Sequence, residues 1–205
     1  MKKFLLLVVV GVVLVGCGPK NVVTLKRDAA PAVAQPGWYA RNESGFSMMV
    51  PESYQVPRDP GLSMQDLGNL SSPAVSYGMT PGQESTTANA TLILNDKNYR
   101  PLPGEPTTGL TVNIKKVGGG ADLEGEAKRV SENLMNDDMT KVELPVGPGY
   151  QIKHHGKMVT GDEVWRLIYV VCDGETVYRV DFTTTHGADT IGNVGPGVME
   201  SFRVQ

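Results

Sequence analysis

The segment from Glu163 to Thr184 constrains the fold of this 205-residue chain more than any other. Two runs rich in β-branched and aromatic residues flank the dipeptide Asp173-Gly174. Such a dipeptide between apolar runs is the strongest short-range signal for a β-hairpin. A two-residue turn at Asp173-Gly174 pairs Cys172 with Glu175, and this pairing sets the register of the whole hairpin.

The predicted register sorts the hairpin side chains onto two faces, because successive residues of a strand point to opposite sides. One face carries the pairs Trp165–Phe182, Leu167–Val180 and Tyr169–Tyr178, and the other carries Arg166–Asp181 and Val170–Val177. The first face is wholly apolar or aromatic, so we expect it to be buried against the one long helix of the chain. The second face is half polar, and we expect it to be partly covered.

The long helix is predicted over residues 122–138. Leu123, Ala127, Val130 and Leu134 recur at spacings of four, three and four residues, which places them on one helix face. Asp122 is a typical N-cap residue. Strands are predicted over residues 45–50, 75–79, 90–94, 110–117, 141–144 and 150–155, and a short helix near 196–202.

The first seventeen residues predict the location of the protein. Lys2 and Lys3 precede an apolar run, Phe4 to Val15, that contains only apolar residues and Gly. A bilayer crossing needs about 20 apolar residues, so this run has the length of a signal-peptide core instead. It ends in Leu14-Val15-Gly16-Cys17, which resembles the lipobox of bacterial lipoproteins.

This resemblance implies cleavage between Gly16 and Cys17, a diacylglycerol on the Cys17 sulfur and an acylated new amino terminus. Two acyl chains already give stable anchoring, so three should hold the protein on a membrane. In that family an Asp after the Cys is the usual inner-membrane retention signal, and this chain has Gly18. We therefore expect a cell-envelope location, on the outer membrane facing the periplasm if the host has two membranes. The alternative is an ordinary secretory signal with an accidental Cys.

Cleavage would divide the chain into a signal peptide (1–16), a lipidated Cys with a flexible tether (17–37) and a globular domain (38–205). The tether has Pro, Ala and scattered charge without a period, and at about 3.3 Å per residue it could reach about 60 Å. The mature chain has 17 basic and 22 acidic residues, because Lys2 and Lys3 leave with the signal, and no basic cluster. We therefore expect no nucleic-acid partner. Cys172 would be the only free thiol, so no intramolecular disulfide is possible.

Three short motifs stand out along the chain: Gly45-Phe46-Ser47 with Pro51-Glu52-Ser53-Tyr54, then Tyr178–Thr183, and finally Ser201-Phe202-Arg203. Together they resemble the PsbP/Mog-like proteins, which include envelope lipoproteins of the DcrB and LpqN kind. The resemblance covers about residues 38–203 and implies an α/β/α sandwich, an antiparallel sheet with helices on both faces. It also implies binding to a partner, which we expect to be another envelope protein, without catalysis. The chain departs from the pattern at Tyr54, where Trp is common, and in the long polar segment 57–90.

The histidines are the first candidates for chemistry. His154 and His155 are adjacent on a predicted strand, so they point to opposite faces and cannot easily bind one ion. A metal site would need one of them together with His186 and a carboxylate such as Asp162 or Asp189. We expect exposed histidines at strand ends and no bound metal.

No other motif predicts catalysis or a cofactor. Gly118-Gly119-Gly120 precedes the helix, but a dinucleotide fingerprint needs Gly at position 123, which is Leu. Cys172 has no activating base near it in the sequence, and a free Cys is usually a small buried apolar residue. The expected function is a non-catalytic binding or assembly module. The alternative is an envelope enzyme, such as a metal-assisted hydrolase, with a site built from loops 57–90 and 153–162.

Overall fold

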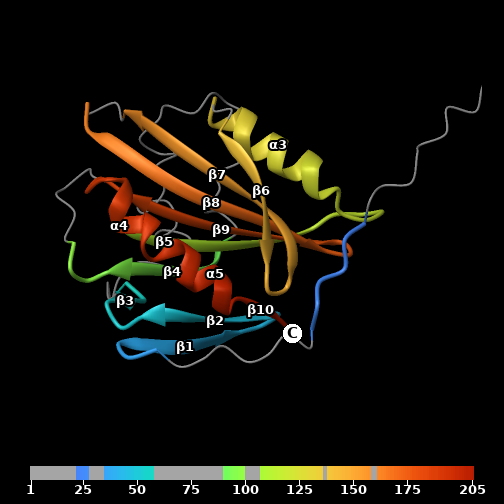
Figure 1. Cartoon of the computed structure of the whole chain (residues 1–205), viewed down its shortest axis with the longest axis horizontal. Coiled ribbons are helices and arrows are strands. Elements are labelled where there is room, and N and C mark those ends of the chain that lie inside the picture. Colours follow the sequence, from blue (N-terminus) through green and yellow to red (C-terminus); the bar gives the residue numbers. More distant parts are fainter. Residues whose placement is uncertain (1–21, 28–34, 58–89, 100–106, 136–137, 158–160) are drawn as a thin grey trace, which may run out of the picture.

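The computed structural model describes residues 22–27, 35–57, 90–99, 107–135, 138–157 and 161–205 (Figure 1). The signal peptide, Gly16, Cys17, the predicted strand 75–79 and nearly all of the segment 57–90 lie outside these residues. None of the helices in the described part of the chain has the length and apolar composition that a bilayer crossing requires.

An antiparallel sheet of seven strands forms the centre of the domain, in the order β3-β4-β5-β9-β8-β7-β6. Its strands are β3 (Tyr54–Gln55), β4 (Ala90–Asp96), β5 (Gly109–Lys116), β6 (Met139–Leu144), β7 (Gly147–Lys157), β8 (Glu163–Asp173) and β9 (Thr176–Thr184). The predicted antiparallel sheet is therefore confirmed. Strands β8 and β9 are long, buried and central, as their apolar sequences indicate.

A second, smaller sheet packs on one face of the main sheet. It has the order β1-β2-β10 and consists of β1 (Trp38–Glu43), β2 (Phe46–Pro51) and β10 (Arg203–Val204). Phe46 of β2 stacks on Phe202, with ring centroids 5.8 Å apart, and Phe202 meets Tyr178 of β9 edge to face. These aromatic contacts join the two sheets.

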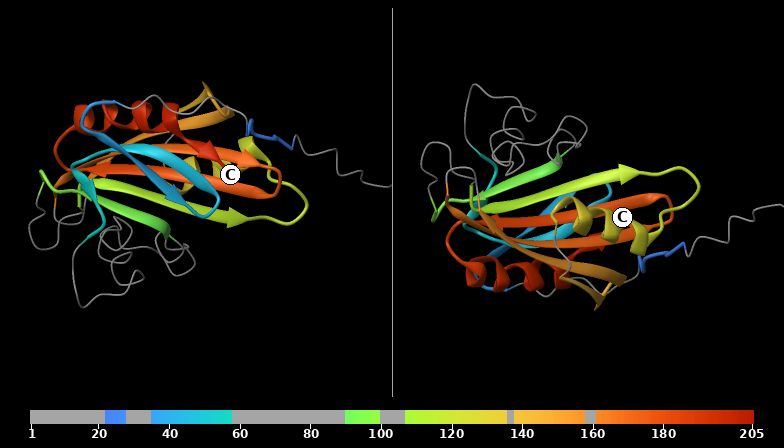
Figure 2. Two further views of the ribbon diagram at one scale, coloured as in Figure 1. Left: turned by 90° about the horizontal axis from the view of Figure 1, so that it is seen from below. Right: turned by 90° about the horizontal axis from the view of Figure 1, so that it is seen from above.

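The helices lie on opposite sides of the main sheet (Figure 2). Helix α3 (Leu123–Asn133) covers one face of β7 and β8, and the short helices α4 (Ala188–Gly192) and α5 (Gly195–Ser201) cover the other. The second face is thus covered by two short helices together with the small sheet. This mixed layer differs from the helix layer that an α/β/α sandwich implies.

The prediction that the apolar hairpin face packs against the long helix was wrong. Leu167 and Phe182 share a core with Ile191 of α4 and Val198 of α5, whereas α3 packs on the opposite face, against Ile168, Val170 and Cys172. Trp165 is only partly buried. The reason is that both faces of β8 are apolar, so side-chain alternation alone could not show which face α3 covers. Helix α3 is also shorter than the predicted 122–138, because it ends at Asn133.

The hairpin turn is Gly174-Glu175, one residue later than predicted. Cys172 pairs with Val177 and Leu167 with Phe182, so the predicted register was displaced by two residues. A displacement of two residues leaves every side chain on its face, and the predicted face sets are confirmed. Gly174 has φ 59°, which suits the first central position of a type II′ turn.

Residues 22–27 lie against the domain, although their sequence without a period predicts a free tether. Leu25 is 3% exposed and belongs to the core under the small sheet, α4 and α5. The backbone N–H of Leu25 donates to Asp173 Oδ1 (3.0 Å), and that of Lys26 donates to the carbonyl of Val146 (2.7 Å). The N–H of Gly174 donates to the carbonyl of Val23 (2.9 Å). We call Val22–Arg27 the docked segment.

Leu25→Ala should therefore destabilise the domain, because it leaves a cavity beside the hairpin turn. The expected loss is about 2–5 kcal/mol of unfolding free energy, the usual range for a buried Leu. Urea denaturation of residues 18–205 would measure it. Val22→Ala is the matched control, since Val22 is 48% exposed, and it should cost less than about 0.5 kcal/mol. A loss for Leu25→Ala as small as the loss expected for Val22→Ala would show that the docked segment is not part of the core.

Candidate functional site

A cavity of about 560 Å³ lies between β7, β8 and the helices α4 and α5. We call it the α4 groove. Its floor is apolar, with Leu167 and Ile191 only 4% and 3% exposed. Its rim is charged, with Lys153 from β7 on one side and Asp189 from α4 on the other. An apolar floor with a few polar groups around it is typical of a binding site.

An aromatic platform stands at one wall of the α4 groove. His155 and Trp165 are paired across β7 and β8, and their rings stack with centroids 4.8 Å apart and an interplanar angle of 7°. The His155 ring is 54% exposed and its Nε2 lies 3.6 Å from a carboxylate oxygen of Glu163. A flat, partly exposed aromatic pair can contact a planar or cationic group of a partner.

The α4 groove extends to an edge of the main sheet. Strand β6 begins at Met139, which pairs with Ile152, and the N–H of Lys153 donates to the carbonyl of Asp138. Beyond that point, β7 pairs only with β8 in the described part of the chain. His154 and Arg166 also line the groove, although their side chains point to the α3 side of the sheet. A partner could reach the backbone of β7 here.

The structure brings only some of the candidate metal ligands to one cavity. His154, His155 and Asp189 all line the α4 groove, although His154 and His155 point to opposite faces, as predicted. His186 instead stacks on Tyr99, with ring centroids 4.6 Å apart, and is not among the residues lining the groove. No three His, Cys, Asp or Glu residues in the described ranges are arranged to hold a metal. His154 is partly buried, whereas we expected an exposed side chain.

A buried cluster of charged residues lies beside the groove, on the α3 side of the sheet. Asp181 is 5% exposed and forms ion pairs with Arg166 and Arg179, the latter at 2.8 Å. Thr183 donates a further hydrogen bond to Asp181 Oδ1 (3.3 Å). Two guanidinium groups against one carboxylate leave the cluster with one excess positive charge.

Burial and charge act in opposite directions on Asp181. Burial alone would raise the pKa of its carboxyl group, but the attraction and hydrogen bonds of Arg166 and Arg179 outweigh burial, so the pKa of Asp181 is lowered. The pKa of His154 is also lowered, by burial first and then by the charge of Arg166. His154 is therefore neutral at pH 7.

The cluster also contains polar atoms without partners. Arg179 Nε and both amide atoms of Asn113 are buried and form no hydrogen bond. Asn113 of β5 lies directly opposite Arg179 of β9. Buried polar atoms of this kind are usually satisfied by ordered water or by a small polar ligand. The sequence offered a signal for this cluster, since Arg166, Arg179 and Asp181 are charged residues inside otherwise apolar strands.

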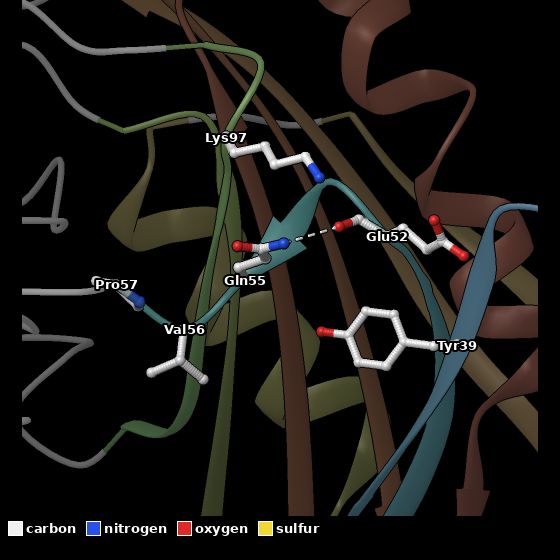
Figure 3. A pocket seen from close by; sticks show the side chains of 6 residues that line it. All are labelled: Tyr39, Glu52, Gln55, Val56, Pro57 and Lys97. Atoms are coloured by element: carbon white, nitrogen blue, oxygen red, sulfur yellow. Dashed lines mark hydrogen bonds between the residues drawn. The ribbon is translucent and has the colours of Figure 1, made fainter.

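A second cavity, of about 510 Å³, lies at the end of β3 (Figure 3). Tyr39, Glu52, Gln55 and Lys97 line it, and the Gln55 amide donates to the carbonyl of Glu52 (3.3 Å). The Tyr39 hydroxyl donates to the carbonyl of Tyr54 (2.7 Å). The lining continues to Pro57, and the residues that come next in the chain lie outside the described ranges.

Cys172 is positioned as a core residue. It is fully buried in the core beneath α3, and burial raises the pKa of its thiol to about 12. A thiol with this pKa is protonated at neutral pH and is a poor nucleophile.

Gly120 has φ 88°, and an added Cβ would lie 2.6 Å from the side chain of Val22. This Gly therefore permits the docked segment to pass close to the start of α3.

No family model and no curated protein matches the chain. Similar solved structures include a Bacteroides thetaiotaomicron VPI-5482 protein, with 13% identity, a TM-score of 0.49 and 84% of this chain covered. The match covers 49% of that protein, so this chain spans about half its length. Another is cyanobacterial PsbP (CyanoP) from Synechocystis sp. PCC 6803, with 15% identity, a TM-score of 0.47, and 94% and 99% of the two chains covered. TM-scores this low establish neither family nor function.

Asp181→Asn should destabilise the domain, because it leaves two guanidinium groups buried without their counter-charge. The expected loss at pH 7 is about 3–5 kcal/mol. Since the pKa of Asp181 is lowered on folding, its stabilising contribution is complete above about pH 4 and is lost as the pH falls through the folded-state pKa. The gap between wild type and Asp181→Asn should therefore shrink in acid.

Denaturant melts at several pH values would measure that gap. Asp189→Asn is the matched control, because Asp189 is exposed on α4 and its removal should cost less than about 0.5 kcal/mol. A gap that stays constant down to about pH 2 would contradict the assignment of the ion pairs to Asp181.

Proposed function

We propose that this protein is a lipid-anchored protein of the bacterial cell envelope that binds another envelope protein through the α4 groove, without catalysis. The groove is the observation that carries the proposal. Its apolar floor can hold an aliphatic side chain, and the His155–Trp165 platform offers an exposed aromatic anchor. Lys153 and Asp189 give the rim charges of both signs, which favours a peptide surface over a uniformly charged ligand.

The sheet edge beside the groove favours an extended partner segment. Along β7, the backbone N–H groups of successive residues point alternately toward β6 and toward β8, and the N–H of Lys153 points toward β6. By the same alternation, the N–H groups of His155 and Lys157 point toward that open edge. An extended segment could add to β7 there, in line with β6, and place alternate side chains in the groove.

Membrane attachment is proposed from the lipobox, Leu14-Val15-Gly16-Cys17. Three acyl chains on Cys17 would hold the protein on the envelope membrane, on the periplasmic side of the outer membrane in a host with two membranes. We further propose membership of the PsbP/Mog-like proteins, from the three short motifs and the order of strands and helices. No observation on the described residues favours the alternative, a metal-assisted hydrolase.

Cys17→Ser should abolish lipidation, because the Cys17 thiol is the only acceptor for the diacylglycerol in the resembled pathway. In wild type, membrane association should resist high salt and yield to detergent, since buried acyl chains are not screened as surface charges are. Cell fractionation and the intact mass of the mature protein would test this. A wild-type protein that washes off in salt, or whose mass shows an unmodified amino terminus, would refute the lipoprotein assignment.

A photo-reactive amino acid at Asp189 should cross-link the partner in intact envelopes. His155→Asp, in the same background, should weaken the adduct by about tenfold, the effect of about 1.4 kcal/mol of binding energy. This change removes the stacked ring at a side chain that is 54% exposed, so the fold should survive. The same amino acid at Lys141, exposed on β6, is the matched control and should give no adduct. Equal adducts at both positions, or an adduct insensitive to His155→Asp, would show that the α4 groove is not the binding site.

A further inference from the structure

We infer that the turn between β8 and β9 faces the lipid bilayer and that the α4 groove faces away from it. This inference rests on the proposed lipid anchor at Cys17. It names the surface that lies against the membrane, which the lipobox alone does not determine. A tether of residues 17–37 that was free along its whole length would leave the orientation of the domain unconstrained.

The docked segment is held at one end of the domain by contacts from three separate regions. Asp173 of the hairpin turn accepts the N–H of Leu25 and pairs with Arg27 at 3.2 Å. Val146, in the turn between β6 and β7, accepts the N–H of Lys26. Val22 bridges to Asp122, just before α3. These three regions meet at the same end of the molecule, where the docked segment is drawn in blue (Figure 1).

The length of chain between the anchor and the docked segment is short. Five peptide units join Cys17 to Val22, and fully extended they span at most about 18 Å. The predicted tether of about 60 Å therefore does not apply, because residues 22–27 within it are fixed to the domain. A lipidated Cys17 at the membrane surface would keep Val22, and with it the β8–β9 turn, within about 18 Å of the headgroups.

The α4 groove lies toward the other end of β8. Trp165 precedes Asp173 by eight residues on the same strand, which is about 27 Å at about 3.4 Å per residue. The groove and its open strand edge would therefore stand clear of the bilayer, facing the aqueous compartment. The turn end carries charges of both signs, including Lys26, Arg27 and Glu175. The orientation therefore follows from the chain length and the docking contacts.

Energy transfer from the lipidated protein to labelled lipid headgroups would test the orientation. A donor dye would be placed at Glu175→Cys or at Asp189→Cys, both in a Cys172→Ala background, and the protein reconstituted in phosphatidylethanolamine–phosphatidylglycerol vesicles. Cys17 is blocked by its lipid, so labelling is specific. Transfer from position 175 should exceed that from position 189 by at least about twofold, since the strand length separates the two ends by about 27 Å.

A variant with twenty Gly and Ser residues inserted between Lys20 and Asn21 is the matched control. It leaves the docked segment and the domain unchanged but lengthens the free chain, so the difference between the two dye positions should largely disappear. Equal transfer from the two positions in the wild-type protein, while it still sediments with the vesicles, would overturn the orientation alone. Failure of the wild-type protein to sediment with the vesicles would overturn the proposed anchor and the orientation with it.

Discussion

The fold depends on one constraint, which is that β8 is apolar along most of both of its faces. From Arg166 to Cys172, every residue of β8 is buried. A strand of this kind must lie in the middle of a sheet that is covered on both sides. Helix α3 provides one cover, and α4, α5 and the small sheet provide the other. The charged cluster lies where Arg166 of β8 and Asp181 of β9 take the place of apolar residues. Their mutual ion pair offsets the free-energy cost of burying the two charges.

Asp173 connects the hairpin with the amino-terminal part of the chain. Its carboxylate accepts the N–H of Leu25 and pairs with Arg27, so its side-chain contacts are with the docked segment and not within the hairpin turn. The turn then forms one residue later, at Gly174-Glu175, where Gly174 supplies the positive φ. One residue thus explains both the displaced register and the docked segment. Leu25 completes the core only because Asp173 and Val146 satisfy the backbone N–H groups that its burial removes from water.

Local patterns in the sequence predicted the parts of the fold that depend on neighbouring residues. The two side-chain sets of the hairpin and the helix containing Leu123 and Val130 were readable from periodicity, whereas the antiparallel sheet was expected from the resemblance to the PsbP/Mog-like proteins. Which face α3 covers was not readable, because Leu167 and Ile168 are equally apolar and only tertiary packing distinguishes them. The docked segment was also missed, since Leu25 stands in a stretch without a period. The α4 groove was missed because it combines residues from β7, β8 and α4 that are distant in the chain.

The docked segment and the α4 groove lie at opposite ends of β8. Residues 22–27, which follow the proposed membrane anchor closely in the sequence, are fixed to the β8–β9 turn. The long strands β7 and β8 extend from that end of the domain to the α4 groove. The His155–Trp165 platform, at the far ends of β7 and β8, is separated from the turn by most of the length of β8. Because β8 is hydrogen-bonded on both sides and packed on both faces, it is a rigid spacer between the two ends. A rigid spacer, in place of a long tether, would present the groove to a partner at a fixed height and in a fixed orientation, which lowers the entropy lost on binding.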